Sequence, residues 1–240
     1  MAELMYMIAT ILILPALIFG MWASINVTST FNRYSGVSSA MGITGAALAR
    51  RLLDQNGCGH VNVEQSRGHL SDHYDPRTKM VRLSPDVFNG TSLAALGVAA
   101  HEVGHAIQDH TNYPPLKIRQ LVIKTTSLVN KALLPLIIIG LVLSIVATSA
   151  NGDIWHYVLI GLCAMYGLSF LINVITLPTE YDASNRAKKM LQNGILYDEA
   201  EYTAVSGVLR AAALTYVAAL VSSLAFFLRF LALVLLTRKR

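Results

Sequence analysis

The sequence predicts a mainly α-helical protein that passes through a membrane several times and carries one small domain outside the bilayer. Of its 240 residues, 54% are hydrophobic and only 14% are charged, whereas an ordinary soluble domain carries about 25% charged residues. The hydrophobic residues also form runs long enough to cross a bilayer core, which takes about 20 residues in a helix. A third observation is a pair of histidines at helical spacing, which predicts a metal site in the polar part of the chain.

The charge and the cysteines exclude two other classes of protein. The net charge of +5 is modest, and beside so much apolar sequence it is typical of residues that flank membrane spans, not of a nucleic-acid-binding surface. Cys58 lies in a glycine-rich turn and Cys163 in an apolar run, so we expect no structural disulfide. The sequence therefore predicts the lipid bilayer as a partner and predicts no nucleic-acid partner.

Residues 1–25 are expected to form the first transmembrane helix, because Leu4 to Trp22 is apolar. Pro15 would kink this helix, which membrane helices tolerate. A cleaved signal peptide would begin with a basic region, but the only charged residue before the apolar run is Glu3. We therefore expect the helix to be retained.

Residues 26–127 are expected to form a metal-binding catalytic domain. Thr44-Gly45 is a helix start, and the glycines after residue 56 end that helix. Val61 to Leu83 then alternates between apolar and polar residues, with a turn at Asp75-Pro76, which predicts a small β-sheet.

The next helix, at about residues 91–110, contains the motif H-E-x-x-H as His101-Glu102-Val103-Gly104-His105. Residues four apart lie on one face of a helix, so His101 and His105 can direct their imidazoles at one zinc ion. In such sites the glutamate is the general base that takes a proton from the water activated by the metal. Gly104 would let a substrate or a neighbouring strand approach the helix closely.

The last extended stretch before this helix is the candidate for binding the backbone of a peptide substrate by β-strand addition. An ordinary sheet without a role in substrate binding is the alternative. The stretch consists of Lys79, Met80, Val81, Arg82 and Leu83.

Residues 128–177 are expected to form a transmembrane hairpin of two apolar runs, Leu133 to Ala147 and Val158 to Leu177. Residues 178–210 are expected to form helices that supply a third metal ligand and complete the catalytic domain. Residues 211–236 form a fourth apolar run, and residues 237–240 a basic tail. The prediction is therefore about four transmembrane or membrane-associated helices.

Glu180 is the candidate third ligand, because the hairpin returns the chain to the membrane face that it left. Two histidines and one glutamate are a known ligand set of catalytic zinc. Asp109, His110 and Asp182 are competing ligands, although Asp182 is also placed to pair with Arg186 four residues later. A glutamate that only stabilises a helix N-terminus is the remaining alternative for Glu180.

Four stretches of the sequence together resemble the YugP-like membrane zinc metallopeptidases, a family related by pattern to the HtpX-like and CAAX-processing membrane metalloproteases. The stretches cover nearly the whole chain in order: DHYDPRTKMVRLS, AAHEVGHAIQ, TLPTEYDASNRA and VLRAAALTYVAAL. The resemblance implies a multi-pass zincin, a gluzincin-like endopeptidase with one Zn²⁺ per chain in a bacterial cell membrane. It implies an active site of His101, Glu102, His105 and Glu180, acting on membrane or membrane-proximal proteins.

The sequence departs from the HtpX-like pattern at Ser184, where those enzymes commonly have an aspartate that braces a ligand histidine. The brace here is expected from Ser184, from Asp182 or from another acid. The candidates for an oxyanion donor are Tyr181, Arg186 and Tyr113.

A zinc-binding membrane scaffold or regulator without catalytic activity is the competing class of function. Glu102 distinguishes the two classes, because a structural zinc site needs no base. The positive-inside rule places the catalytic domain on the cytoplasmic side. Four full spans would then put the basic tail outside, which goes against the same rule. Residues 211–236 are therefore expected either to cross the membrane or to be re-entrant. The basic residues that flank the domain are Arg33, Lys117, Arg119, Lys124, Arg186, Lys188 and Lys189.

Overall fold

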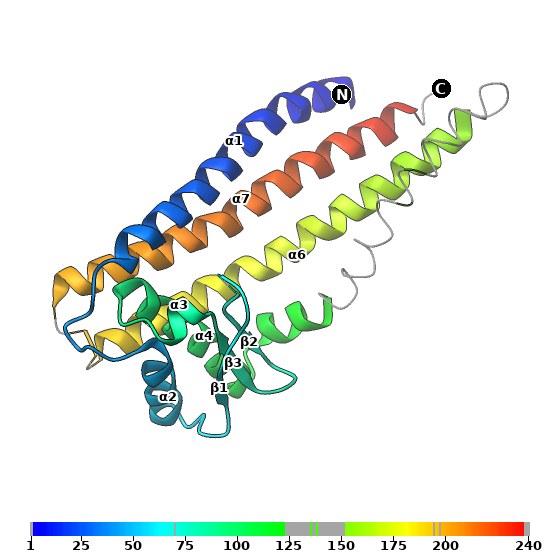
Figure 1. Cartoon of the computed structure of the whole chain (residues 1–240). Coiled ribbons are helices and arrows are strands. Elements are labelled where there is room, and N and C mark those ends of the chain that lie inside the picture. The colour runs from blue at the N-terminus through cyan, green and yellow to red at the C-terminus, as the bar shows by residue number, and fades with distance from the viewer. Residues whose placement is uncertain are drawn as a thin grey trace. The chain divides into compact units, whose positions relative to one another are not determined.

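The computed structural model is mainly helical with one small sheet (Figure 1). It describes residues 2–69, 71–122, 135, 138, 152–193, 195–196 and 198–237. Three of the described helices are long and apolar enough to cross a membrane: α1 (Ala2–Ser35), α6 (Gly152–Gln192) and α7 (Glu199–Thr237). Apart from residues 135 and 138, the span predicted from Leu133 to Ala147 lies outside the described residues, and so do Lys124 and residues 238–240. The mainly helical, membrane-type architecture is confirmed.

The helices are longer than predicted. Helix α1 continues past residue 25 to Ser35, and in this polar segment the hydroxyls of Thr28, Ser29 and Ser35 donate to carbonyls three or four residues back. Helix α6 runs unbroken through Pro178, where we expected a span to end and a separate helix to begin. A proline removes one N–H from a helix, and membrane helices tolerate this loss.

Helix α7 joins two segments that we expected to be separate, residues 197–210 and 211–236. A continuous helix of 39 residues contains no reversal of the chain. Whether residues 211–236 cross the bilayer or are re-entrant stays a prediction, now for the second half of one long helix.

The chain divides into two compact units, of which one comprises Met1–Met21, Ile118–Leu177 and Tyr216–Arg240. Polar groups in its apolar helices find partners on neighbouring helices. The amide of Asn173 on α6 donates to the hydroxyl of Ser223 on α7 at 3.2 Å, and the hydroxyl of Ser222 donates to the carbonyl of Ala16 at 3.4 Å. Such contacts, together with close packing, hold apolar helices together where burial from water cannot.

The other unit, Trp22–Lys117 and Pro178–Thr215, contains the polar domain. Its shorter helices are α2 (Gly45–Gln55), α3 (Pro85–Phe88) and α4 (Leu93–His110). The predicted helix starts are confirmed for α2 and α4, because Thr44 accepts a hydrogen bond from the backbone of Ala47 and Ser92 one from Ala95, both at 3.2 Å. These caps satisfy amide groups that have no partner inside the helix.

The sheet has three strands, β1 (Asn62–Gln65), β2 (His73–Asp75) and β3 (Met80–Leu83), in the order β1-β3-β2. Strand β3 is parallel to β1 and antiparallel to β2. The prediction that a substrate pairs with the backbone of Lys79–Leu83 is therefore wrong, because β3 has a strand on each side. Among the described strands, only β1 and β2 have an outer edge.

Helix α4 lies in the middle of the core of this unit. Most of its residues are buried, and α2, the sheet and the adjoining parts of α6 and α7 supply the apolar side chains that surround it. A helix that is apolar on nearly all sides is a buried helix. The H-E-x-x-H motif thus stands on a rigid, central element. The core includes Leu48, Leu52, Val81, Leu83, Leu96, Val103, Leu191 and Val205.

Candidate metal centre

Three side chains from two helices converge on one point. His101 and His105 extend from α4 and Glu180 extends from α6, and one ligand atom from each lies within 4.8 Å of the others. The Nε2 atoms of His101 and His105 lie 3.2 and 3.5 Å from the same oxygen of Glu180. The two imidazole planes are nearly perpendicular, at 83°. The structure thus brings the predicted third ligand to the two histidines.

The two distances to Glu180 and the chemistry of the three side chains fit a zinc ion. Tetrahedral ligands with bonds of about 2.0–2.1 Å to zinc lie about 3.3 Å from one another, which falls between the two distances to Glu180. Glu180 is only 1% exposed, and a buried carboxylate is costly unless a cation or a proton compensates its charge. Among the residues that the structure describes, this is the one group of three or more ligand-type side chains close enough to hold a metal.

Each histidine is braced through its other ring nitrogen. The Nδ1 atom of His101 lies 3.2 Å from the hydroxyl of Ser184, and that of His105 lies 2.9 Å from the amide oxygen of Gln108. An amide oxygen only accepts hydrogen bonds, so the proton of His105 is on Nδ1 and the lone pair of Nε2 is free for a metal. Ser184 was one of the expected braces.

Gln108 was missed by sequence reasoning. It is fully buried, and its amide nitrogen donates to the carbonyl of Thr179 and to the carboxylate of Asp182, both at 2.8 Å. It therefore links α4 to the segment of α6 that carries Glu180. The signal was available in the sequence, because a residue three positions after His105 lies on the same face of the helix.

Two of the other predicted residues support Gln108. The carboxylate of Asp182 also accepts a hydrogen bond from Arg186 at 2.6 Å, which confirms the pairing predicted at this spacing. The guanidinium of Arg186 lies 5.8 Å from the centre of the Tyr113 ring. Tyr181 is 42% exposed and lies about 100° around the helix from Glu180, so it does not share the face of that ligand.

The competing ligands have other partners. The carboxylate of Asp109 accepts hydrogen bonds from the phenol of Tyr74 at 2.6 Å and from the amine of Lys79 at 2.5 Å. The ring of His110 lies against that of His60, with 5.9 Å between their centres. These contacts are distinct from the group formed by the two histidines and Glu180.

Glu102 is buried beside the centre. Burial is the main cause that raises its pKa to about 7. The charge of His101 opposes this rise, the charges of Glu180 and Asp72 add to it, and a hydrogen bond from the backbone of Tyr74 opposes it. A carboxyl group with a pKa near neutrality can both accept and release a proton at physiological pH.

Gly104 allows α4 and α6 to meet. A Cβ atom at this position would lie 2.6 Å from the carbonyl oxygen of Ala183 and 3.2 Å from two further backbone atoms of that residue. The motif glycine thus admits helix α6, where we expected the close approach of a substrate or a strand. Backbone atoms cannot rotate out of the way as a side chain can, so the contact depends on glycine.

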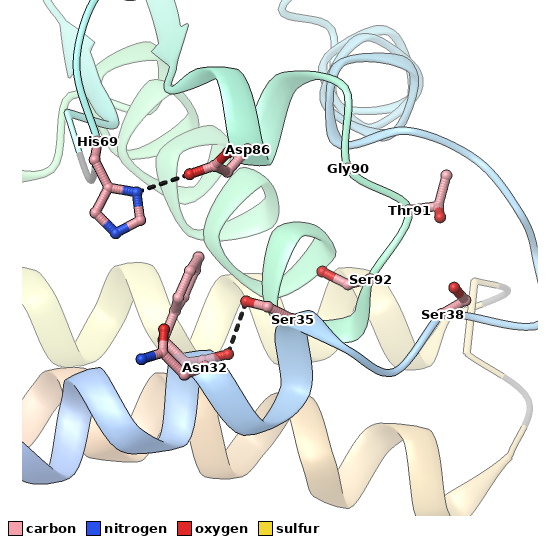
Figure 2. Close-up of a pocket in the computed structure, with 9 residues that line it drawn as sticks. Asn32, Ser35, Ser38, His69, Asp86, Gly90, Thr91 and Ser92 are labelled. Atoms are coloured by element: carbon pink, nitrogen blue, oxygen red, sulfur yellow. Dashed lines mark hydrogen bonds and ion pairs between the residues drawn. The ribbon is translucent and has the colours of Figure 1, made fainter.

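The same unit has a pocket of about 380 Å³ at the start of α4 (Figure 2). Figure 2 shows the ring of His69 directed at the carboxylate of Asp86, 2.7 Å away, with several hydroxyl groups on the other side of the pocket. His69 is exposed and ion-paired. The lining residues are Phe31, Asn32, Ser35, Ser38, His69, Asp86, Gly90, Thr91 and Ser92, none of which belongs to the metal centre.

Comparison with known proteins gives two matches that span nearly the whole chain. The family model described as "Putative neutral zinc metallopeptidase" matches residues 9–235. The protein named "Putative membrane protease YugP" of Bacillus subtilis (strain 168) is 40% identical over 225 residues, which cover 93% of this chain and 95% of that protein. No solved structure matches the chain. The family match includes the H-E-x-x-H motif and Glu180.

Gly104→Ala is expected to destabilise the protein by about 1–3 kcal/mol, because the new methyl group overlaps the backbone of Ala183 in a packed core. Thermal unfolding of the purified protein in detergent measures the loss. Gly161→Ala is the matched control: it is also a glycine of a helix, but an added Cβ meets no atom within 4 Å. Equal melting temperatures for Gly104→Ala and the wild type would contradict the packing argument.

Gln108→Leu is expected to weaken zinc binding by about 10- to 100-fold, because His105 loses the acceptor that fixes its proton. Competition with a chelator of known affinity measures the change. Gln108→Glu keeps an acceptor for His105 but cannot donate to Thr179 and Asp182, so it separates the bracing of the histidine from the link to α6. Unchanged zinc affinity in Gln108→Leu would exclude the bracing role.

Proposed function

The chain belongs to this zinc metallopeptidase family, and from that premise we propose that it is a membrane-embedded, zinc-dependent endopeptidase. The observation that carries the proposal is the convergence of His101, His105 and Glu180, with the buried Glu102 beside them. The two histidines and Glu180 would hold one Zn²⁺ per chain. A structural zinc site commonly has four protein ligands, whereas a catalytic site has three and an open position. The three ligands found among the described residues therefore favour an enzyme over a zinc-binding scaffold.

Bound zinc supplies Lewis acidity, which makes water a stronger acid and polarises a carbonyl group. Glu102 acts as the general base: its carboxylate accepts the proton of the attacking water and then delivers that proton to the leaving amine. Its pKa of about 7 suits both transfers near neutral pH. Ser184 and Gln108 hold the two histidines in the orientation that the reaction requires.

The substrate is proposed to be a peptide segment of a membrane or membrane-proximal protein. Three long apolar helices with mostly exposed side chains support a location in a bilayer. The peptide would add to the outer edge of β2, because β3 is flanked on both sides and the backbone of Tyr74 on β2 contacts Glu102. The basic residues around the domain support a position on the cytoplasmic side.

Glu180→Ala is expected to abolish zinc binding, because the two histidines alone do not form the three-ligand set of a catalytic zinc site. Elemental analysis of the purified variant after a mild chelator wash measures zinc per chain, with about one zinc expected for the wild type. Asp86→Asn is the matched control, since it removes an acid of the same unit that lies outside the centre. Equal zinc in Glu180→Ala and the wild type would exclude Glu180 as a ligand.

Glu102→Gln is expected to retain zinc and to lower the cleavage rate by at least about 100-fold, because an amide cannot accept the proton of the water. Cleavage of a quenched fluorescent peptide library by the full chain in detergent measures the rate, and elemental analysis measures the zinc. A variant that keeps its zinc and cleaves at the wild-type rate would exclude the base role of Glu102. Loss of both zinc and activity would make Glu102 a structural residue of the centre.

A further inference from the structure

Tyr74 contacts helix α4 at two points. Its phenol donates to the carboxylate of Asp109 at 2.6 Å, and its backbone lies near enough to the carboxyl group of Glu102 to favour the charged form of that group. Glu102 and Asp109 are seven residues apart, so they lie two turns apart on one face of the helix. Tyr74 therefore spans the face of α4 that presents the general base.

Strand β2 needs this attachment more than a central strand would. It is three residues long and is the edge strand of the sheet, paired on one side with β3. A short edge strand is held by few backbone hydrogen bonds, so a side-chain contact has a large influence on its position. The phenol of Tyr74 is well suited to be that contact, because burial is the main cause that raises its pKa and keeps it protonated as a donor.

The turn between β2 and β3 is fixed to the same carboxylate. The amine of Lys79 donates to the oxygen of Asp109 that also accepts from Tyr74, at 2.5 Å. Lys79 has a φ of 52°, in the left-handed backbone region that residues other than glycine rarely adopt. Asp109 is 12% exposed, so its two partners compensate a largely buried charge.

We propose that Tyr74, Asp109 and Lys79 form a latch that holds strand β2 against α4 and thereby positions the carboxylate of Glu102. Tyr74 and Asp109 are positioning residues, because they act on the reaction through Glu102 and through the edge of β2. The role of the latch in catalysis rests on the proposed peptidase function. The contact between β2 and Glu102 does not depend on that function, and it can be measured in the absence of any substrate.

The first test is hydrogen exchange at the amides of residues 73–75 in the full-length, zinc-loaded protein in detergent. Tyr74→Phe removes the phenol oxygen and little else, so faster exchange at these amides, by about tenfold or more, is expected. Asp109→Ala should have at least this effect, because it also releases Lys79. The double variant should exchange no faster than Asp109→Ala alone, because that change already removes the acceptor of the phenol. Tyr202→Phe, a tyrosine of α7 in the same unit, is the matched control. Unchanged exchange in Tyr74→Phe overturns the latch.

The second test is the steady-state kinetics of the same variants on the peptide library. For Tyr74→Phe we expect a kcat lower by about tenfold or more with a full zinc content, because the base is displaced while the metal site is intact, and a raised KM, because the β2 edge that would hold the peptide is loosened. Asp109→Asn keeps an acceptor oxygen and should recover part of the rate. Faster exchange with an unchanged kcat overturns the positioning role. If the wild type cleaves nothing, the peptidase proposal fails, and the exchange data alone decide the latch.

Discussion

The close packing of α4 on α6 is the constraint on which the metal centre depends. At Gly104 the backbones of the two helices are in contact, and there is no room for a Cβ atom. This contact lies between the two histidines in the sequence and opposite the segment that follows Glu180. Only at such a small separation can the Nε2 atoms reach the glutamate oxygen at 3.2 and 3.5 Å. The glycine of the motif is therefore as important for the geometry as the histidines.

A neutral side chain connects the polar groups on either side of that contact. Gln108 presents its amide oxygen to His105 and its amide nitrogen to Asp182 and to the backbone of α6. A carboxylate in its place would put a further negative charge next to the buried Glu180. The amide fixes the histidine without that cost, and the charge of Asp182 is compensated by Arg186 nearer the surface. The brace of His105 is thus connected to the surface without a further buried charge at position 108.

Local patterns in the sequence predicted the local parts of the structure. The helix start at Thr44, the small sheet, the motif helix and the pairing of Asp182 with Arg186 all depend on residues a few positions apart. The errors came from long-range effects. The order β1-β3-β2 places the last strand in the middle, which alternation of residues cannot reveal, and the unbroken course of α6 through Pro178 depends on its surroundings. The spacing of Gln108 from His105 placed it on the ligand face of α4, but its link to Thr179 and Asp182 depends on the packing of α6, which local patterns do not reveal.

The two parts of the metal centre are far apart in the order of synthesis. His101 and Glu180 are separated by 79 positions, and an apolar run predicted to enter the bilayer lies between them. A chain still emerging from the ribosome carries both histidines and the base long before it carries the third ligand. If the centre is catalytic, a nascent or truncated chain lacks the complete ligand set, so the hydrolytic machinery cannot form before the segment with Glu180 has been made and packed against α4. In a proteolytic centre, this distribution of the ligands along the chain would delay the onset of proteolysis until the domain is nearly complete.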